Sequence, residues 1–255
     1  MRILISNDDG IEAKGIKVLE GIARQFSNEV TVVAPDSNMS GAGHSLTLKS
    51  PLRLKEIDEA HFAVDGTPTD SVVMALRHIM NEKPDFILSG INGDSNLADD
   101  ITYSGTVAAA MEACLLGIPA VAFSQETNED GTINWDIAKT YAPIILKLIM
   151  NKFKFVENVL LNINFPPGDV KDVKGIKITS QGTRAIDDCV IQSIDPRGHP
   201  YFWMGPADYR KIMNNEDLDT DLGAIHSGYV SITPLSLDMT SRSQMKILNE
   251  LFAEK

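Results

Sequence analysis

Cysteine is scarce in this chain of 255 residues, which has only Cys114 and Cys189. They lie far apart and belong to no CxxC or Cys/His spacing, so zinc is disfavoured and both are interpreted as buried or incidental thiols. Long hydrophobic runs are missing as well. No apolar run reaches the ~20 residues of a membrane-spanning helix, and the apolar stretch at the N-terminus is too short for a signal peptide. We therefore expect a cytoplasmic protein without membrane association.

Positive charge is the next shortage, since 23 Lys and Arg residues stand against 35 Asp and Glu residues and the net charge is -12. Such an acidic surface repels a polyanion, which argues against binding of long nucleic acid. A small phosphorylated substrate stays compatible with this charge, because one bound divalent cation and one helix N-terminus can reverse the local field.

Three familiar motifs are also absent: GxGxxG, GxxxxGKS/T and GxSxG. Without the glycine fingerprint a dinucleotide cofactor is disfavoured. What the first two thirds of the chain do contain is an alternation of apolar strand-like segments and segments with helical spacing. Apolar strands separated by helices are typical of a parallel sheet covered on both faces, so we predict an α/β fold with a mostly parallel sheet. The predicted strands are 2–6, 29–34, 61–64, 85–90, 118–124 and 158–163, and the predicted helices are 12–26, 68–81, 104–116 and 135–151.

The pattern changes near Pro166, where turn residues, weak β segments and the aromatic cluster Tyr201-Phe202-Trp203 begin to dominate. A strand at 228–233 and a helix at 240–252 then return to regular structure. We therefore divide the chain into an α/β core at 1–165, a smaller β-rich excursion at 166–228, and a return strand with a C-terminal helix at 229–255.

Three polar loops follow predicted strands: Asn7–Gly10, Pro35–His44 and Ile91–Tyr103. In an open parallel sheet, ligands bind beyond the carboxyl ends of the strands. The polarity of these loops, in a chain whose strands are so apolar, therefore indicates a binding site at that edge.

The first loop contains two adjacent carboxylates, Asp8 and Asp9. At a strand end they repel each other unless a cation lies beside them, and oxygen ligands favour Mg²⁺, Mn²⁺ or Ca²⁺. The alternative is an ordinary βα turn in which Asp9 caps the next helix and Gly10 adopts a positive φ. The motif alone leaves the two interpretations level. Because the pair is adjacent and not a DxD motif, a covalent intermediate at Asp8 is not the first interpretation.

The other two loops offer backbone and neutral groups. The Gly-rich segment 36–45 would let N–H groups approach an anion, with an ordinary flexible loop as the alternative. Segment 89–96 adds amide and hydroxyl oxygens and leads towards Ser104, where the free N–H groups of a helix start suit a phosphate. Simple N-capping by Ser104 is the alternative there. His44 could serve as a general acid, but a loop histidine is more often a surface residue.

Taken together, these blocks resemble the SurE family of stationary-phase survival proteins, which are metal-dependent nucleotidases. Agreement covers nearly all of residues 1–124 and is looser in the C-terminal third. The matching segments are MRILISNDDG at the start, VVAPDSNMSGAGHSLT at 32–47, DGTPTDSVVMAL at 65–76, DFILSGIN at 85–92, DDITYSGTVAAAMEACLLGIPAVAFS at 99–124, LLNINFP at 160–166 and VSITPL at 230–235.

The resemblance implies a Rossmann-like three-layer core and a 5'-nucleotidase, which hydrolyses nucleoside 5'- and 3'-monophosphates and, in some members, short polyphosphate. For this chain we expect hydrolysis by a metal-activated water. It also implies one Mg²⁺ or Mn²⁺ ion per subunit, and a homodimer or homotetramer in which the excursion and its aromatic cluster contact a neighbouring subunit. Carried over by position, the catalytic residues are Asp8 and Asp9, the metal ligands are Asp8, Asp9, Ser40 and Asn92, and the phosphate-binding residues are Asn96, Ser104, Gly105 and Thr106.

One loop departs from the family pattern of Asn-x-Gly-x-Asn, then Leu or Met, then Gly, because residues 92–98 read Asn-Gly-Asp-Ser-Asn-Leu-Ala. Asn92 retains the asparagine of the family pattern, but Asp94 adds a carboxylate near the expected metal. It could bind the ion, repel the phosphate, or point to solvent and cap the loop. Two other functions stay open: a non-catalytic nucleotide or metal sensor, and a flavodoxin-like or dinucleotide-dependent oxidoreductase, which the missing glycine fingerprint disfavours.

Overall fold

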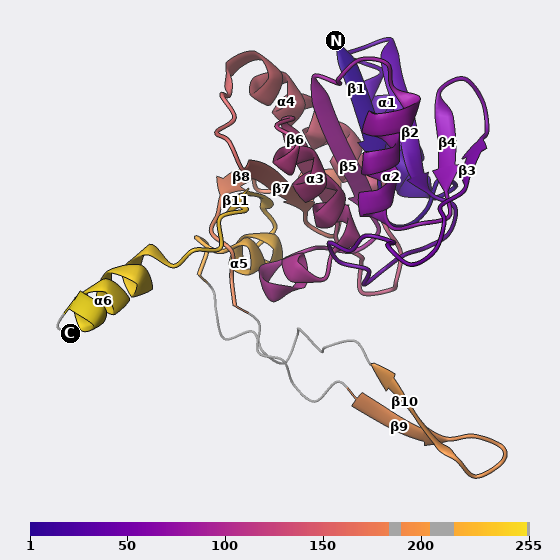
Figure 1. Ribbon diagram of the computed structural model, residues 1–255. Helices are drawn as coiled ribbons and strands as arrows, with labels where there is room; N and C mark the ends of the chain where they lie inside the picture. Colours follow the sequence, from indigo (N-terminus) through magenta and orange to yellow (C-terminus); the bar gives the residue numbers. More distant parts are fainter. Residues whose placement is uncertain (184–189, 205–216, 254–255) are drawn as a thin grey trace.

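One large sheet organises the protein, whose computed structural model describes residues 1–183, 190–204 and 217–253. Nine strands of this described part join in the order β3-β4-β2-β1-β5-β6-β7-β11-β8 (Figure 1). They are β1 (Arg2–Ser6), β2 (Glu29–Pro35), β3 (Leu54–Glu56), β4 (His61–Val64), β5 (Phe86–Asn92), β6 (Ala120–Gln125), β7 (Val159–Phe165), β8 (Ile176–Ile178) and β11 (Val230–Ser236).

Strand direction places the loops that matter at one edge. The six strands from β4 to β7 in this order are parallel to one another, whereas β3 and β11 run antiparallel to β4 and β7. The mostly parallel sheet confirms the predicted α/β class. It also brings the carboxyl ends of β1, β2 and β5 together, so the three polar loops share one edge of the sheet.

Helices cover both faces of the sheet and so complete a three-layer, Rossmann-like core (Figure 1). Along β1, Ile3 and Ile5 pack on the α1/α4 side and Leu4 packs on the α2/α3 side, each without solvent exposure. Burying each such side chain contributes about 1.5–3 kcal/mol, which explains why these strands are apolar throughout. The helices are α1 (Lys14–Ala23), α2 (Pro68–Met74), α3 (Gly105–Leu115), α4 (Trp135–Lys152), α5 (Asp221–His226) and α6 (Arg242–Ala253).

The helix predicted at 68–81 is only partly α-helical. It is α-helical as far as Met74 and continues as a π-helical turn, Ala75–Ile79, in which the Met80 N–H donates to the Ala75 carbonyl at 2.9 Å. Its start follows the sequence signal, since Thr67 is the N-cap and Pro68 opens the helix. The strand β3 has no counterpart in the prediction, because three residues are too few to show a period.

Residues 166–228 contribute to the main sheet and to a separate hairpin. Strand β8 forms the edge of the main sheet beside β11, and α5 packs against β11. Strands β9 (Val190–Ile194) and β10 (Pro200–Met204) instead pair with each other and project from the body, as does α6 (Figure 1).

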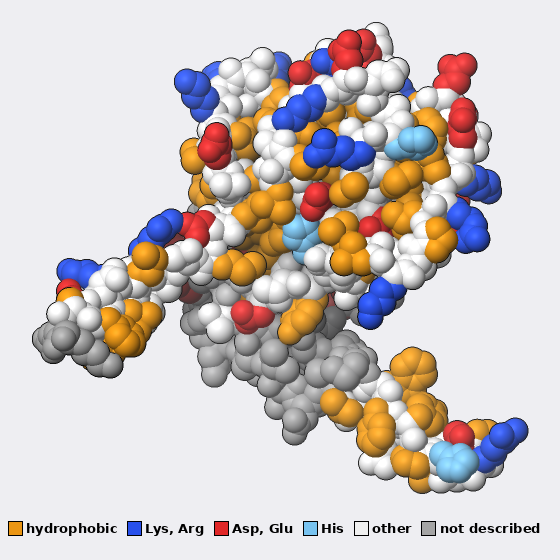
Figure 2. Space-filling model, viewed as in Figure 1, with side chains coloured by type: hydrophobic (Ala, Val, Ile, Leu, Met, Phe, Trp, Pro, Cys, Tyr) orange, Lys and Arg blue, Asp and Glu red, His pale blue; other side chains and the backbone are white. Residues whose placement is uncertain are grey.

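Both projecting segments expose apolar side chains. Figure 2 shows hydrophobic side chains gathered on the hairpin and on α6. Phe202 and Trp203 are 59% and 62% exposed, and α6 has no buried residue. No helix in the described ranges is long and apolar enough to cross a membrane. Cys114 is a free, buried thiol on α3, and Cys189 lies outside the described residues.

Candidate metal and phosphate site

The turn after β1 is closed by the side chain of Asn7. Its Oδ1 accepts from the Gly10 N–H at 3.2 Å, and its Nδ2 donates to the Gly10 carbonyl at 3.0 Å. Gly10 has φ of +101°, and a Cβ there would meet the backbone of Ser37 at 3.2 Å. This turn therefore needs glycine both for its conformation and for the close approach of the second loop.

The capping alternative for Asp9 does not match the structure. The N-cap of α1 is Ala13, which makes no side-chain cap bond. Asp9 Oδ2 instead accepts from the Gly93 N–H at 3.3 Å, so it links the first loop to the loop after β5. Burial raises the pKa of the Asp9 carboxyl, and the neighbouring charge of Asp8 raises it further.

Asp8 is 4% exposed and lies against the N-terminus of α3. Its Oδ1 accepts a hydrogen bond from the Thr106 hydroxyl. A Cβ on Gly105 would meet the Asp8 Cβ at 2.6 Å, which shows how closely the helix start approaches this carboxylate. Burial raises the pKa of Asp8, while hydrogen bonds from Thr106 and the backbone of Gly105 act in the opposite direction. Sequence reasoning missed this contact, and no local pattern marks it.

Ser104 caps α3 as expected, because its Oγ accepts from the Val107 N–H at 3.0 Å. The N–H groups of Gly105 and Thr106 lie in the first turn of the helix, where they have no intrahelical partner, and they face Asp8. The expected phosphate-binding start of α3 and the expected metal ligand Asp8 are therefore in direct contact.

The second loop is held beside Asp8 at several points. The Met39 N–H donates to the Asp8 carbonyl at 2.8 Å, and the Gly43 N–H donates to the Tyr103 carbonyl at 3.1 Å. Ser40, the next residue after Met39, is exposed at this edge. His44 lies further along, where its Nε2 is 3.0 Å from a carboxylate oxygen of Glu112 on α3.

The third loop begins with Asn92 at the end of β5. Its Nδ2 donates to the main-chain carbonyl of Asp94 at 2.8 Å, which leaves its Oδ1 available as a ligand. The Asp94 carboxylate accepts from the Ser95 N–H at 3.0 Å. Although solvent reaches this side chain, the packing of the loop around its carboxyl raises the pKa of Asp94. The loop-capping alternative is the one that these contacts favour.

Asn96 is 7% exposed and is surrounded by buried side chains of the next two strands. Its main-chain N–H donates to Asn164 Oδ1 at 2.8 Å, and its Nδ2 donates to Ser124 Oγ at 2.8 Å. Asn92 is paired in register with the same Ser124. The two asparagines of the third loop are therefore both neighbours of one β6 residue.

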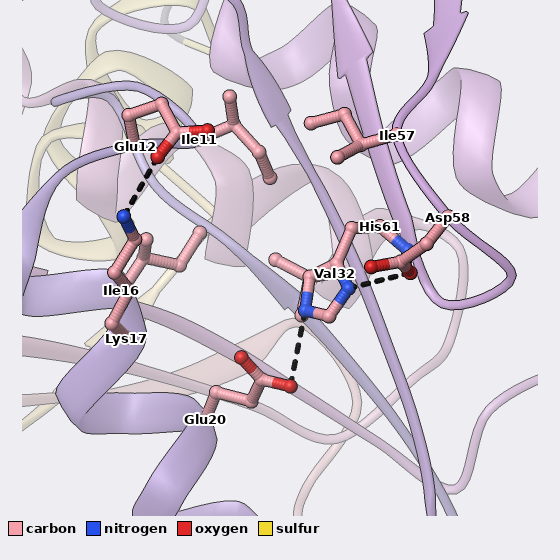
Figure 3. Close-up of a pocket in the computed structure, with 9 residues that line it drawn as sticks. All are labelled: Ile11, Glu12, Ile16, Lys17, Glu20, Val32, Ile57, Asp58 and His61. Atoms are coloured by element: carbon pink, nitrogen blue, oxygen red, sulfur yellow. Dashed lines mark hydrogen bonds and ion pairs between the residues drawn. The ribbon is translucent and has the colours of Figure 1, made fainter.

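A cavity of about 190 Å³ opens beside α1, but its chemistry does not suit a phosphate. Figure 3 shows that its charged residues face one another, with Lys17 Nζ 2.7 Å from Glu12 Oε2. The remaining carboxylates at its rim would repel an anion. It is lined by Ile11, Glu12, Ile16, Lys17, Glu20, Val32, Ile57, Asp58 and His61.

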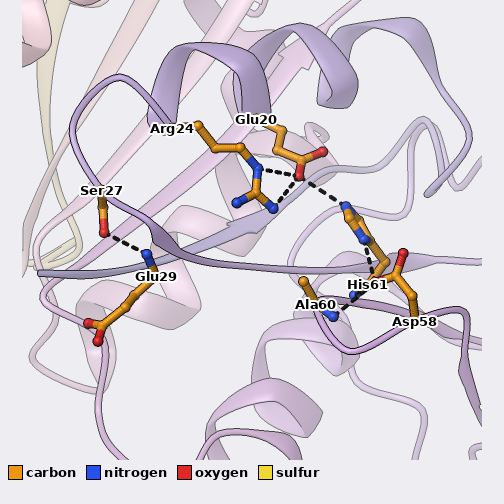
Figure 4. A network of polar contacts seen from close by, with 7 residues as sticks. All are labelled: Glu20, Arg24, Ser27, Glu29, Asp58, Ala60 and His61. Atoms are coloured by element: carbon orange, nitrogen blue, oxygen red, sulfur yellow. Dashed lines mark hydrogen bonds and ion pairs between the residues drawn. The ribbon is translucent and has the colours of Figure 1, made fainter.

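The rim of that cavity is a closed polar network (Figure 4). His61 Nε2 lies 3.1 Å from Glu20 Oε1, its Nδ1 lies 2.7 Å from Asp58 Oδ1, and Arg24 pairs with Glu20 at 2.7 Å. Burial lowers the pKa of His61, but the bonds and charges of Asp58 and Glu20 outweigh it, so the pKa is raised overall. Among the described residues of this rim, each positive group is thus paired with a carboxylate and is not available to a phosphate.

The donors around Asp8 and Asp9 suit a hard cation. No Lys, Arg or His of the described residues forms a salt bridge with either carboxylate. The same residues contain no cluster of three His, Cys, Asp or Glu side chains for a metal. Two carboxylates supplemented by amide and hydroxyl oxygens form an all-oxygen ligand set. Such a set suits Mg²⁺ and Mn²⁺ better than it suits Zn²⁺.

Comparisons with known proteins identify the family. A family profile described as Survival protein SurE matches residues 3–188. The 5'-nucleotidase SurE of Paramagnetospirillum magneticum is 47% identical over 99% of this chain and 96% of its own length. That of Brucella anthropi is 48% identical with the same coverage. The crystal structure of the SurE protein from Aquifex aeolicus matches with a TM-score of 0.84 and 42% identity, over 98% of this chain and 99% of its own. The chain therefore belongs to the SurE family of survival proteins.

Proposed function

We propose that this protein is a metal-dependent 5'-nucleotidase, which hydrolyses nucleoside 5'-monophosphates to nucleoside and phosphate. The observation that carries the proposal is the pair Asp8 and Asp9, which has no cationic partner among the described residues. Asp8 is buried against the start of α3, and the half-buried Asp9 contacts the third loop at Gly93. Relatives that are 47–48% identical over nearly the whole chain carry the name 5'-nucleotidase SurE.

We assign the divalent ion to the edge where the three polar loops meet. Asp8 and Asp9 supply the charge, and Ser40 and Asn92 add neutral oxygens from loops that hydrogen bonds attach to these two residues. When bound, the ion offsets charge on the phosphoryl oxygens and lowers the pKa of water.

The phosphate is assigned to Asn96 and to the start of α3, formed by Ser104, Gly105 and Thr106. Free N–H groups at a helix N-terminus attract an anion through their partial positive charge. The Asp8 carboxylate already accepts hydrogen bonds from the N–H groups of Gly105 and Thr106 at this helix start. A phosphate dianion can share the helix start with Asp8 only when a cation offsets their repulsion, which accounts for metal dependence.

Several finer properties belong to the same proposal. The ion is Mg²⁺ or Mn²⁺, one per subunit, and nucleoside 3'-monophosphates and short polyphosphate are further substrates. The net charge of -12 disfavours long nucleic acid as a partner. The protein is cytoplasmic and forms a homodimer or homotetramer. Residues 1–165 form the catalytic core, the excursion at 166–228 assists assembly, and residues 229–255 complete the fold.

A phosphate-release assay with a panel of substrates tests this function. Protein treated with EDTA should be inactive, and Mn²⁺ or Mg²⁺, but not Zn²⁺ alone, should restore release from nucleoside monophosphates, because the donors are all oxygens. Full activity in exhaustively chelated protein contradicts the metal assignment. Nucleotide binding without release under any of these ions would instead identify a sensor.

A further inference from the structure

Three fully buried polar side chains surround Asn96. They belong to neighbouring strands, and the sequence of the loop that carries Asn96 gives no reason for their being polar. They are Ser124 on β6 and Asn162 and Asn164 on β7, each with no solvent exposure. Asn162 and Asn164 alternate with apolar residues along β7 and share the sheet face of Leu160, which belongs to the α2/α3 side of the core. Polar amides thus occupy positions that an apolar core would otherwise fill.

These side chains hold the main chain of Asn96 on both sides. Asn164 Oδ1 accepts from the Asn96 N–H at 2.8 Å, and its Nδ2 donates to the Asn96 carbonyl at 3.2 Å. One amide side chain therefore makes both hydrogen bonds that a neighbouring strand would make. Asn162 Nδ2 donates to the same carbonyl at 2.8 Å, and Ser124 Oγ accepts from the Asn96 side chain at 2.8 Å.

The arrangement is poorly explained by fold stability alone. Asn162 Oδ1 is buried and has no hydrogen-bond partner in the structure, and an unsatisfied buried acceptor is unfavourable. An apolar side chain of similar size at position 162 would avoid that penalty, and Asn164 would still bond to the Asn96 carbonyl. What the amides do provide is a single position for the main chain of Asn96, at the loop that we assign to the phosphate.

We infer that Asn164 is a positioning residue for Asn96, assisted by Asn162 and Ser124. It fixes the backbone of Asn96 so that the Asn96 side chain is presented to the substrate phosphate beside the start of α3. The inference rests on the proposed function through the phosphate contact of Asn96. Asn164 itself touches neither substrate nor ion, so its effect on catalysis passes through Asn96.

The test compares Asn164→Ala with Ser231→Ala. Ser231 is the cross-strand neighbour of Asn164, is equally buried, and bonds to Thr179 and not to Asn96. Asn164→Ala should raise the KM for the nucleotide and the dissociation constant of inorganic phosphate by about tenfold, because misplacement of a binding group weakens contact with the phosphate. The Mn²⁺ activation constant should stay within about twofold, as should all three values in Ser231→Ala.

A double-mutant cycle with Asn96→Ala decides whether Asn164 acts through Asn96. In the Asn96→Ala background, Asn164→Ala should change the KM by no more than about twofold. Multiplicative effects of the two substitutions would overturn the inference, as would an Asn96→Ala variant with normal phosphate affinity. If Asn164→Ala does not fold, Ser124→Ala removes the side-chain partner of Asn96 with a smaller change and should raise the KM in the same direction; an unchanged KM there overturns the inference.

Phosphate binding keeps this test separate from the proposed function. Calorimetric titration of Mn²⁺-loaded protein with inorganic phosphate needs no turnover. Wild-type protein that binds phosphate but releases none from nucleotides would contradict the nucleotidase proposal, and the loss of phosphate affinity in Asn164→Ala would still support the positioning role.

Discussion

Among single residues, Asp8 and Asp9 combine a functional role with a burden on folding. Burial raises the pKa of both carboxyls, and the charge of Asp8 raises that of Asp9 further. A carboxyl whose folded pKa lies above its unfolded value binds protons more tightly in the folded state. Stability therefore falls as the pH rises from the unfolded pKa through the folded one. In metal-free protein the pair therefore contributes less to stability at neutral pH than at acidic pH, and a bound cation offsets this loss.

We expect Asp9→Asn to separate activity from stability. It should raise the melting temperature of the protein in EDTA at pH 7, because it removes a half-buried carboxyl with a raised pKa next to Asp8. Phosphate release with Mn²⁺ should fall by about a hundredfold or more, because a charged ligand is lost. Asp8→Asn should show a similar loss of release. Asp94→Asn is the control, since that exposed carboxylate caps its loop. Near-normal turnover of either Asp8→Asn or Asp9→Asn at saturating Mn²⁺ would refute the metal assignment.

Gly105 gives a second test at the residue scale. Gly105→Ala places a methyl group 2.6 Å from the Asp8 Cβ, so the helix start and Asp8 must separate. We expect kcat/KM to fall at least about tenfold, since small misplacements at a site have such effects. Gly21→Ala in α1 is the matched control, because its new Cβ would meet no atom within 4 Å apart from its chain neighbours and the backbone of its own helix. That control should be stabilised by about 0.4–1 kcal/mol in urea denaturation. Equal activity of the two variants would rule out this account of Gly105.

Among the elements, the start of α2 anchors the second loop. Thr67 Oγ1 and the Asp70 carboxylate form a capping box, and Asp70 Oδ1 also accepts from the Thr47 N–H at 3.0 Å. The Thr67 hydroxyl donates to the Ser45 carbonyl at 2.7 Å. Burial acts to raise the pKa of Asp70, but the bonds from Thr47 and Thr67 prevail, so the pKa is lowered. The loop that carries Ser40 is thus fixed at its far end by a helix cap.

Because the pKa of Asp70 is lowered, its effect on the pH dependence of stability is opposite to that of Asp8 and Asp9. The stability from Asp70 is present above its unfolded pKa and is lost as the pH falls through its folded pKa. We expect Asp70→Asn to destabilise the protein by about 1 kcal/mol at pH 7, and the difference from wild type should shrink as the pH falls below the ordinary carboxyl range. Urea denaturation at a series of pH values measures it. Asp136→Asn, in the first turn of α4, serves as an exposed control. A difference that stays constant with pH would disprove the role of the Asp70 charge.

At the scale of the whole molecule, the projecting hairpin and α6 expose apolar surface that the core does not cover (Figures 1 and 2). Exposed apolar patches of this kind mark protein–protein contacts more often than free surface. The C-terminal part of the chain therefore offers surfaces for a second copy, in agreement with the proposed oligomer.

Light scattering at micromolar concentration tests that assembly. Wild-type protein should have at least twice the 27.9 kDa mass of one chain, and the combined Phe202→Ser and Trp203→Ser substitutions should shift it towards the monomer, since aromatic residues dominate interface energies. Leu148→Ser on α4 is the control, because Leu148 is 51% exposed but lies on neither projecting segment. A wild-type protein that runs as a monomer would rule out the oligomer.

The sequence by itself determined the α/β class, the cap of α2 and the position of Asp8 and Asp9 at a strand end. Those features depend on neighbours in the chain: apolar strands, a Thr-Pro start and a polar turn after β1. The resemblance to a family also identified the expected metal ligands in the sequence, but it did not show which residues surround them. The sequence did not predict the π-helical turn after α2 or the short strand β3. Each is too short to produce a periodic pattern of apolar residues that could be recognised.

Only the tertiary structure decided which distant groups meet. Thr106 donates to Asp8 across 98 residues, and Asn96 donates to Asn164 across 68. The order β1-β5-β6-β7 brings these segments together, and strand order depends on packing of the whole sheet and not on any local pattern. The same packing buries Asp8 and partly buries Asp9, and so raises the pKa of both carboxyls. This property follows from the atoms around a residue in space and not from the local sequence pattern.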